Sequence, residues 1–252
     1  MKPYYQDDSV TLYLGDAEDV LPTLDAVDHV ITDPPYAPIA MKNARSGSTI
    51  KKRRDGKLYD FGYEALLPEM RATVAPILSA LTRRWAIVWT DIESASAWRC
   101  VMSTEYVRTG IWVREHGAPQ FSGDRPAQGV EACYIGHGPA RKKWNGGGHP
   151  ATWIGSIVNS QGERNGHKSP KPLWLMRRQV EQFTDYGDTI LDPYAGSATT
   201  LVAAYELGRR AIGIEISESV CEAAAKRLES LTPPLFTLPA EKPVQAALEA
   251  TP

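Results

Sequence analysis

A strand, a turn of small residues and a helix start follow one another in the segment Leu191-Asp192-Pro193-Tyr194-Ala195-Gly196-Ser197-Ala198-Thr199-Thr200. The free amides and the dipole of such a helix start favour an anion such as a carboxylate. The segment has neither the GxxxxGK[ST] pattern of a phosphate-binding loop nor the GxGxxG pattern of a dinucleotide-binding turn. Glu215 ends the next apolar strand, at the spacing of roughly 20 residues that places an acid beside ribose hydroxyls. We therefore expect a nucleoside site in an α/β fold.

Apolar runs alternate with helical patterns along the rest of the chain. Nearly continuous apolar runs, typical of a parallel sheet covered on both faces, occur at residues 11–14, 29–32, 85–89, 189–191 and 211–214. Helical periodicity is present at residues 66–81, 201–207 and 217–228, and Pro76 is expected to kink the first of these helices. Residues 107–113 and 131–137 predict an antiparallel strand pair. The fold class predicted is α/β, with a doubly wound, mostly parallel sheet.

Each of the five apolar strands ends on an acid. Ligands of an open α/β sheet bind at the carboxyl ends of its strands. A single acid at that place is often a helix N-cap, which is the preferred interpretation of Asp91 taken alone. Five acids together predict an edge lined with carboxylates, which suits a nucleoside with a cationic centre. The five are Asp16, Asp33, Asp91, Asp192 and Glu215.

A second distinctive segment, Asp33-Pro34-Pro35-Tyr36, directly follows an apolar strand. Two prolines fix φ and remove two backbone donors, so a rigid turn closing the strand would also account for this sequence. The same stiffness aims the Asp33 carboxylate and the Pro34 carbonyl at one point beside the ring of Tyr36. Two acceptors and a stacking face suit the exocyclic amino group of a planar base.

The net charge of −2 conceals a marked asymmetry. Residues 37–180 contain 22 Lys and Arg against 11 Asp and Glu, whereas the rest of the chain contains 6 against 19. Solvated surface residues would account for part of this imbalance. The basic residues also cluster beside glycines and a tryptophan, as expected of loops that bind a polyanion. The residues predicted to contact DNA are Lys42, Arg45, Lys51, Lys52, Arg53, Arg54, Arg141, Lys142, Lys143 and Trp144.

Several classes of protein are excluded. No apolar run approaches the roughly 20 residues of a membrane span, and the acidic start of the chain does not resemble a secretion signal. Three widely spaced cysteines and five histidines without ligand spacing indicate neither a disulfide scaffold nor a metal site. We expect a cytoplasmic protein. Trp85, Trp89, Trp98, Trp112 and Trp153 are interpreted as core residues, and Trp144 suits base stacking and packing equally.

The two segments resemble motifs IV and I of the S-adenosylmethionine-dependent DNA amino-methyltransferases. Their order along the chain, with DPPY first, resembles the beta class of that family. Leu14-Gly15-Asp16 resembles the segment that bears an acid near the cofactor adenine, and His167-Lys168-Ser169-Pro170-Lys171-Pro172 resembles the HPTxKP-like segment. The likeness covers most of residues 10–231. The cofactor loop departs from the usual DPFxGSGT, since Tyr194 replaces Phe and Ala198 replaces the second Gly.

The resemblance implies a Rossmann-like methyltransferase fold with a circularly permuted motif order, in one domain over residues 1–231, and a Pro-rich extension over 232–252. The cofactor implied is S-adenosyl-L-methionine. Because no room is left for a large recognition domain, we expect loops at about 37–62, 117–129 and 138–166 to contact DNA. The catalytic residues implied are Asp33, Pro34, Pro35 and Tyr36. The cofactor-binding residues implied are Asp16, Asp33, Ser169, Lys171, Asp192, Tyr194, Ala195, Gly196, Ser197, Thr199 and Glu215.

The activity implied is methylation of the N6 amino group of adenine in double-stranded DNA, with the target base flipped out of the helix. Methylation of cytosine N4 is the near alternative because both bases present an exocyclic amine. RNA or protein-amide methylation comes next, although those families more often carry Asn in place of Asp33 and place the cofactor loop first. The last alternative is a DNA-binding module without catalytic activity, and the replacement of glycine by Ala198 in the cofactor loop is the only feature that favours it. The resemblance further implies location in a prokaryotic cytoplasm or nucleoid, with the gene carried by the host or by a phage. A homodimer is one possible assembly.

Overall fold

The computed structural model describes residues 1–36, 68–115, 126–156 and 170–231. The strands are β1 (Tyr5–Gln6), β2 (Val10–Leu14), β3 (His29–Thr32), β4 (Trp85–Thr90), β5 (Glu105–Arg114), β6 (Val130–His137), β7 (Thr152–Gly155), β8 (Thr189–Asp192) and β9 (Arg210–Glu215). The helices are α1 (Ala17–Val20), η1 (Leu21–Thr23), α3 (Pro68–Leu81), η2 (Ile92–Ser94), α4 (Ala95–Val101), α6 (Leu173–Phe183), α7 (Thr199–Glu206) and α8 (Glu218–Glu229). Each predicted strand and helix corresponds to one of these elements, with ends that differ by at most two residues, and residues 66 and 67 of the first predicted helix lie outside the described residues.

The strands form one sheet in the order β1-β2-β9-β8-β3-β4-β6-β5-β7. Five adjacent strands, from β2 to β4 in this order, run parallel to one another. β6 runs antiparallel to both of its neighbours, β4 and β5, so the predicted antiparallel pair is confirmed. As a result, the first residues of β6 lie at the same edge of the sheet as the last residues of the parallel strands.

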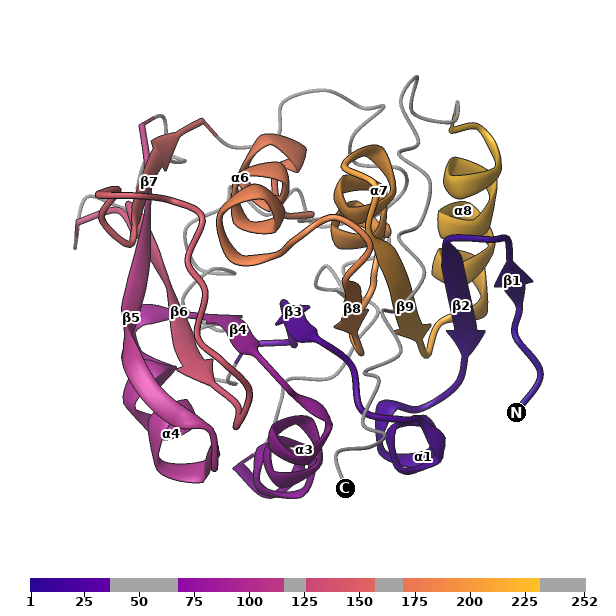
Figure 1. The fold of residues 1–252 in the computed structure, drawn as a ribbon, viewed down its shortest axis with the longest axis horizontal. Helices are drawn as coiled ribbons and strands as arrows, with labels where there is room; N and C mark the ends of the chain where they lie inside the picture. Colours follow the sequence, from indigo (N-terminus) through magenta and orange to yellow (C-terminus); the bar gives the residue numbers. More distant parts are fainter. Residues whose placement is uncertain (37–67, 116–125, 157–169, 232–252) are drawn as a thin grey trace, which may run out of the picture.

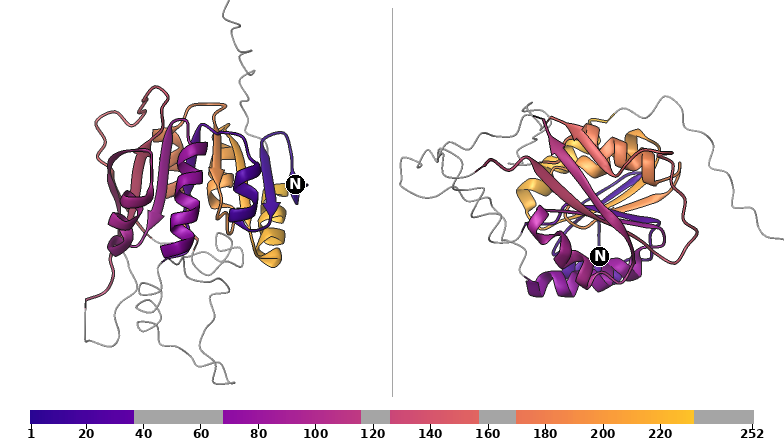
Figure 2. Two further views of the ribbon diagram at one scale, coloured as in Figure 1. Left: turned by 90° about the horizontal axis from the view of Figure 1, so that it is seen from below. Right: turned by 90° about the vertical axis from the view of Figure 1, so that its left-hand side faces the viewer.

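Helices cover both faces of the sheet, with α6, α7 and α8 on one side and α1, α3 and α4 on the other (Figure 1). Successive residues of a buried strand face opposite sides, so Ile190 joins the apolar layer under the first group of helices and Leu191 the layer under the second. Figure 2 shows the twist of the sheet, whose strands cross at an angle from one end to the other. The doubly wound architecture predicted from the continuous apolar runs is therefore confirmed.

The structure confirms some predictions made for single residues and not others. The five tryptophans predicted to be in the core, at positions 85, 89, 98, 112 and 153, are all buried. Gly208 follows α7 with a φ of 72°, as expected of a helix C-terminus. Pro76 lies inside α3, which continues past it to Leu81. Ser217 stands at the N-cap position of α8, but its side chain makes no capping hydrogen bond.

The strand pair β5 and β6 packs closely around Gly110. A Cβ atom at this position would lie 2.7 Å from Sγ of Cys133 and 2.8 Å from the ring of Trp153. We therefore expect Gly110→Ala to lower the free energy of unfolding by about 1–3 kcal/mol, because overpacking forces buried neighbours to shift. Urea denaturation of the purified variants measures this effect. Gly129→Ala is the matched control, since a Cβ there meets nothing within 4 Å; equal stability of the two variants would contradict the prediction.

Candidate functional site

All five predicted acids stand side by side at one edge of the sheet. Each follows or ends one of five adjacent parallel strands, in the order β2, β9, β8, β3 and β4. In that order the acids are Asp16, Glu215, Asp192, Asp33 and Asp91. The parallel alignment alone brings them together, although Asp16 and Glu215 are almost 200 residues apart in the sequence. The structure therefore forms the edge of carboxylates that the sequence predicts.

Two of the strand-end acids serve as helix caps. The Asp16 carboxylate accepts a hydrogen bond of 2.9 Å from the amide of Glu18 at the start of α1. Asp91 accepts a bond of the same length from the amide of Ser94 in η2. The N-cap interpretation of Asp91 is thus confirmed, and Asp16 shares it.

Glu215 ties the turn after β8 to the end of β9. One of its carboxylate oxygens accepts a hydrogen bond of 3.0 Å from the amide of Gly196, and the other accepts one of 2.8 Å from the amide of Ser217. Burial raises the pKa of Glu215, while these amides act to lower it. The amide of Ala195 also bonds to the carbonyl of Ile214. The predicted cofactor loop and the predicted ribose-binding acid therefore form one unit.

Ala198 has a backbone conformation that glycine, the usual residue at this position of the resembled cofactor loop, adopts without strain. Its φ is 62°, in the left-handed region, and it is the only residue other than glycine with a positive φ in the described ranges. The side chain is fully buried directly before α7. An L-residue in this conformation costs roughly 1–2 kcal/mol, whereas glycine adopts it freely. The alanine thus keeps the turn of the loop at the expense of local strain.

Asp192 is the most deeply buried acid of this edge, with 2% of its surface exposed. Its Oδ1 accepts hydrogen bonds from the hydroxyl of Thr32 at 2.7 Å and from the amide of Tyr194 at 3.2 Å. Burial raises the pKa of Asp192 to about 6, although hydrogen bonds from Thr200 and Thr32 act to lower it. Asp192 therefore ionises in a pH range in which most carboxyl groups are already ionised.

Asp33 is held by one oxygen only. Its Oδ2 lies 2.5 Å from the Nζ of Lys171, which stands two residues before α6 and has a side chain only 7% exposed. Its Oδ1 is buried and has no hydrogen-bond partner among the described residues. Burial raises the pKa of Asp33, and the Lys171 ammonium opposes that shift. An acceptor oxygen is therefore left available next to a fixed ion pair.

Glu131 joins this cluster although its position in the sequence predicts no role for it. Its Oε2 lies 3.0 Å from Nζ of Lys171 and accepts a hydrogen bond of 2.6 Å from the hydroxyl of Tyr36. Its Oε1 lies 3.2 Å from the guanidinium of Arg114. Burial acts to raise the pKa of Glu131, but Lys171 and Arg114 hold it below the ordinary value. The sequence feature that could have identified Glu131 is its place at the start of an apolar run predicted to be antiparallel, since the other site acids follow the ends of their runs.

Lys171 is in turn kept charged by its surroundings. Burial alone would lower the pKa of the ammonium, but the carboxylates of Asp33 and Glu131 raise it above the ordinary value. The ammonium also bonds to the hydroxyl of Tyr36 at 2.8 Å and lies 5.1 Å from the centre of that ring. Tyr36 is therefore fixed through its hydroxyl group.

The basic segment Arg141–Trp144 lies at the opposite edge of the sheet. The carbonyl of Lys143 accepts a hydrogen bond from the indole of Trp85, the first residue of β4. Lys142 pairs with Glu105, and Lys143 with Asp185. Trp144 packs edge-on against Phe183, with 4.7 Å between ring centres. The structure thus does not bring this segment to Asp33, and its contact with DNA stays a prediction.

The other predicted DNA contacts and one predicted cofactor contact lie outside the described residues. These are Lys42, Arg45, Lys51, Lys52, Arg53, Arg54 and Ser169, together with the loop at 37–62, most of 117–129, the end of 138–166 and the extension 232–252. Tyr36, Arg114 and Lys171 each stand within two residues of one of these segments. All three belong to the Asp33 cluster.

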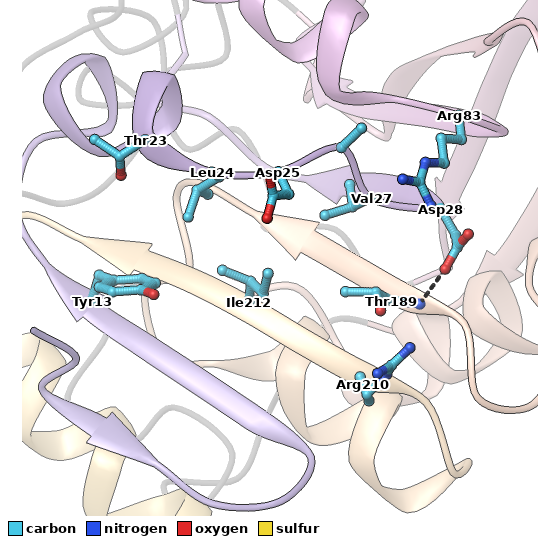
Figure 3. Close-up of a pocket in the computed structure, with 11 residues that line it drawn as sticks. Tyr13, Thr23, Leu24, Asp25, Val27, Asp28, Arg83, Thr189, Arg210 and Ile212 are labelled. Carbon is cyan, nitrogen blue, oxygen red and sulfur yellow. Dashed lines mark hydrogen bonds between the residues drawn. The ribbon is translucent and has the colours of Figure 1, made fainter. Parts of the chain in front are cut away.

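A pocket of about 410 Å³ lies away from the predicted site. It is open to solvent on one side and lies between residues 23–28 and the face of β2, β8 and β9, and Figure 3 shows Tyr13 and Ile212 on its floor. None of the predicted site residues lines it. In the parts of the chain that the structure describes, no cluster of three or more His, Cys, Asp or Glu could hold a metal ion. Within the same parts, no helix is long and apolar enough to cross a membrane.

The raised pKa of Asp192 predicts an unusual dependence of stability on pH. The folded state retains a proton that the unfolded state releases between pH 3.8 and about 6, so this group lowers the free energy of unfolding as pH rises through that window. Asp192→Asn keeps the acceptor oxygen and removes the charge. We expect the variant to match the wild type below pH 4 and to be about 3 kcal/mol more stable well above pH 6.

Chemical denaturation at a series of pH values measures this difference. Asp16→Asn is the matched control, because asparagine caps a helix as well as aspartate does. A constant difference between Asp192→Asn and the wild type across the whole pH range would contradict the prediction.

Comparison with known proteins agrees with this geometry. The family model described as DNA methylase, of the N6/N4 type, matches residues 27–226, well over half of the chain. The type II methyltransferase M2.MboI of Moraxella bovis is 25% identical over 277 residues, which cover 93% of this chain and 94% of that protein.

Solved structures share the fold. The complex of M1.HpyAVI with S-adenosylmethionine has a TM-score of 0.63 at 23% identity, covering 87% of this chain and 98% of that one. The cytosine-N4-specific PvuII DNA methyltransferase has a TM-score of 0.69 at 16% identity, covering 92% and 91%. The chain therefore belongs to the N6/N4 family of DNA methylases, which use S-adenosylmethionine as the methyl donor.

Proposed function

We propose that this protein transfers a methyl group from S-adenosylmethionine to the N6 amino group of adenine in double-stranded DNA. The observation that carries the proposal is the state of Asp33, with Oδ2 held by Lys171 and Oδ1 buried without a partner among the described residues. An unpaired buried acceptor is costly unless a ligand satisfies it. The amino group of a flipped base supplies the missing donor.

The residues beside Asp33 fit the cofactor. The start of α7 offers its positive dipole to a carboxylate, and the Glu215 carboxylate suits ribose hydroxyls. Ile216 follows it with a side chain 63% exposed, an apolar surface suited to the adenine ring. We assign the remaining contacts, as the resemblance implies, to Asp16, Asp33, Ser169, Lys171, Asp192, Tyr194, Ala195, Gly196, Ser197 and Thr199. When bound, S-adenosylmethionine supplies an electrophilic methyl group and keeps the electron pair of the methyl–sulfur bond.

The protein contributes position and electrostatics. The exocyclic nitrogen is a poor nucleophile because its lone pair is delocalised into the ring. Hydrogen bonds from the amino group to Asp33 Oδ1 and to the carbonyl of Pro34 favour a pyramidal nitrogen with its lone pair free. Asp33 then accepts the proton that the methylated nitrogen gives up. Pro35 stiffens the segment, and Tyr36 stacks on the flipped base.

Cytosine N4 is the second candidate. The amino groups of the two bases are chemically alike, and the PvuII enzyme, which shares this fold, is specific for cytosine N4. The Asp-Pro-Pro-Tyr form at residues 33–36 favours adenine by resemblance. We further assign residues 1–231 to one methyltransferase domain, with DNA contacts at about 37–62, 117–129 and 138–166, acting in a prokaryotic cytoplasm or nucleoid.

Transfer of labelled methyl to unmethylated genomic DNA, followed by mass spectrometry of the nucleosides, tests the proposal. We expect N6-methyladenine from the wild type and a rate at least about 100-fold lower from Asp33→Ala. Asp91→Asn, at the end of the neighbouring strand, is the control. Asp91 Oδ2 is also buried without a partner among the described residues, but the proposal gives it no contact with the base, and asparagine keeps the oxygen that caps η2, so this variant should keep its activity. A product of N4-methylcytosine would move the proposal to the second candidate, and the absence of any methylated nucleoside would refute both.

A further inference from the structure

We propose that Glu131 is a positioning residue, which holds Lys171 and Tyr36 so that Asp33 keeps one oxygen free for the target amine. The inference rests on the proposed function and adds to it a residue outside the two motifs. Glu131 lies in β6, almost 100 residues after Asp33. Its side chain is 13% exposed, so the contacts described above are made largely out of water.

The geometry makes Glu131 and Asp33 competitors for one ammonium group. Lys171 Nζ is 2.5 Å from Asp33 Oδ2 and 3.0 Å from Glu131 Oε2. An ammonium with a single carboxylate beside it would attract both oxygens of that carboxylate. With Glu131 on its other side, Lys171 engages only Oδ2 of Asp33, and Oδ1 has no partner among the described residues. Glu131 therefore keeps the acceptor for the base open.

The same carboxylate orients the aromatic ring. Tyr36 donates its hydroxyl hydrogen to Glu131 at 2.6 Å, and Lys171 donates to the hydroxyl oxygen at 2.8 Å. These two bonds fix the end of the Tyr36 side chain opposite the backbone. The ring is consequently held in one orientation before a base arrives, which lowers the ordering cost of stacking.

The charges of the cluster balance without help from solvent. Lys171 and Arg114 are the cations, and Asp33 and Glu131 are the anions. Asp33 also faces the hydroxyl of Tyr36 and the carboxyl group of Asp192. When Asp33 takes up the proton of the methylated amine, Lys171 still has Glu131 as a charged partner. Glu131 thus keeps the ammonium in place through the reaction.

Glu131→Gln tests the inference because it preserves the shape of the side chain and removes its charge. We expect kcat to fall about tenfold or more, and the affinity for S-adenosylmethionine, measured by calorimetry, to fall by a smaller factor because Lys171 keeps Asp33 as a partner. The acid limb of the kcat profile should move to lower pH, because Asp33 loses a like-charged neighbour and becomes the sole carboxylate partner of Lys171. Glu131→Asp, which restores the charge, should recover part of the loss.

Glu222→Gln is the matched control. Glu222 also pairs with a lysine, Lys226, but on the exposed surface of α8; the kcat of this variant should match that of the wild type. A structural role alone would lower stability and cofactor affinity together with kcat, and would leave the pH profile in place. That pattern, or an unchanged kcat in Glu131→Gln, would overturn the inference.

A titration of the Asp33 carboxyl group by carbon-13 NMR separates this inference from the proposed function. The pKa of Asp33 should be lower in Glu131→Gln than in the wild type, whether or not DNA is methylated. A wild type that methylates nothing would overturn the function alone, whereas an unchanged Asp33 pKa would overturn the role of Glu131.

Discussion

The ammonium group of Lys171 lies between the carboxylates of Asp33 and Glu131, and these three groups come from parts of the chain that are distant in sequence. A buried ammonium is stable only when carboxylates compensate for its lost hydration. The end of β3, the start of β6 and the segment before α6 must therefore meet for the Lys171 ammonium to be tolerated. This mutual requirement gives the reactive edge a defined shape.

Much of the fold follows from short-range features of the sequence. Strands of a parallel sheet that is covered on both faces have apolar side chains on both sides, so each appears as an unbroken apolar run such as residues 85–90. Because helices cover both faces of the sheet, its strands reach solvent only at their two ends. Acidic residues therefore come directly after the apolar runs. Asp33, Asp192 and Glu215 were predictable for this reason.

Features that depend on the direction of a strand were harder to predict. Glu131 escapes a search for acids after strands because β6 is reversed and brings its beginning, not its end, to the reactive edge. The segment Arg141–Trp144 leaves the other end of the same strand, so its charges face a different part of the surface from Asp33. Composition identified the segment as basic, but only the topology shows at which edge it lies. The left-handed conformation of Ala198 likewise depends on the packing of α7 against its neighbours.

The buried position of Asp192 has a consequence for recognition. A carboxyl group with a pKa of about 6 is largely protonated in mildly acidic solution. In that pH range a positively charged ligand that binds beside the carboxyl group favours its ionised form, so binding releases a proton from the protein into the buffer. The affinity for such a cation then increases as acidity falls, and the heat of binding depends on the ionisation enthalpy of the buffer. Binding of a cation at this edge is therefore coupled to release of a proton. The affinity for a neutral ligand of the same shape does not benefit from this coupling.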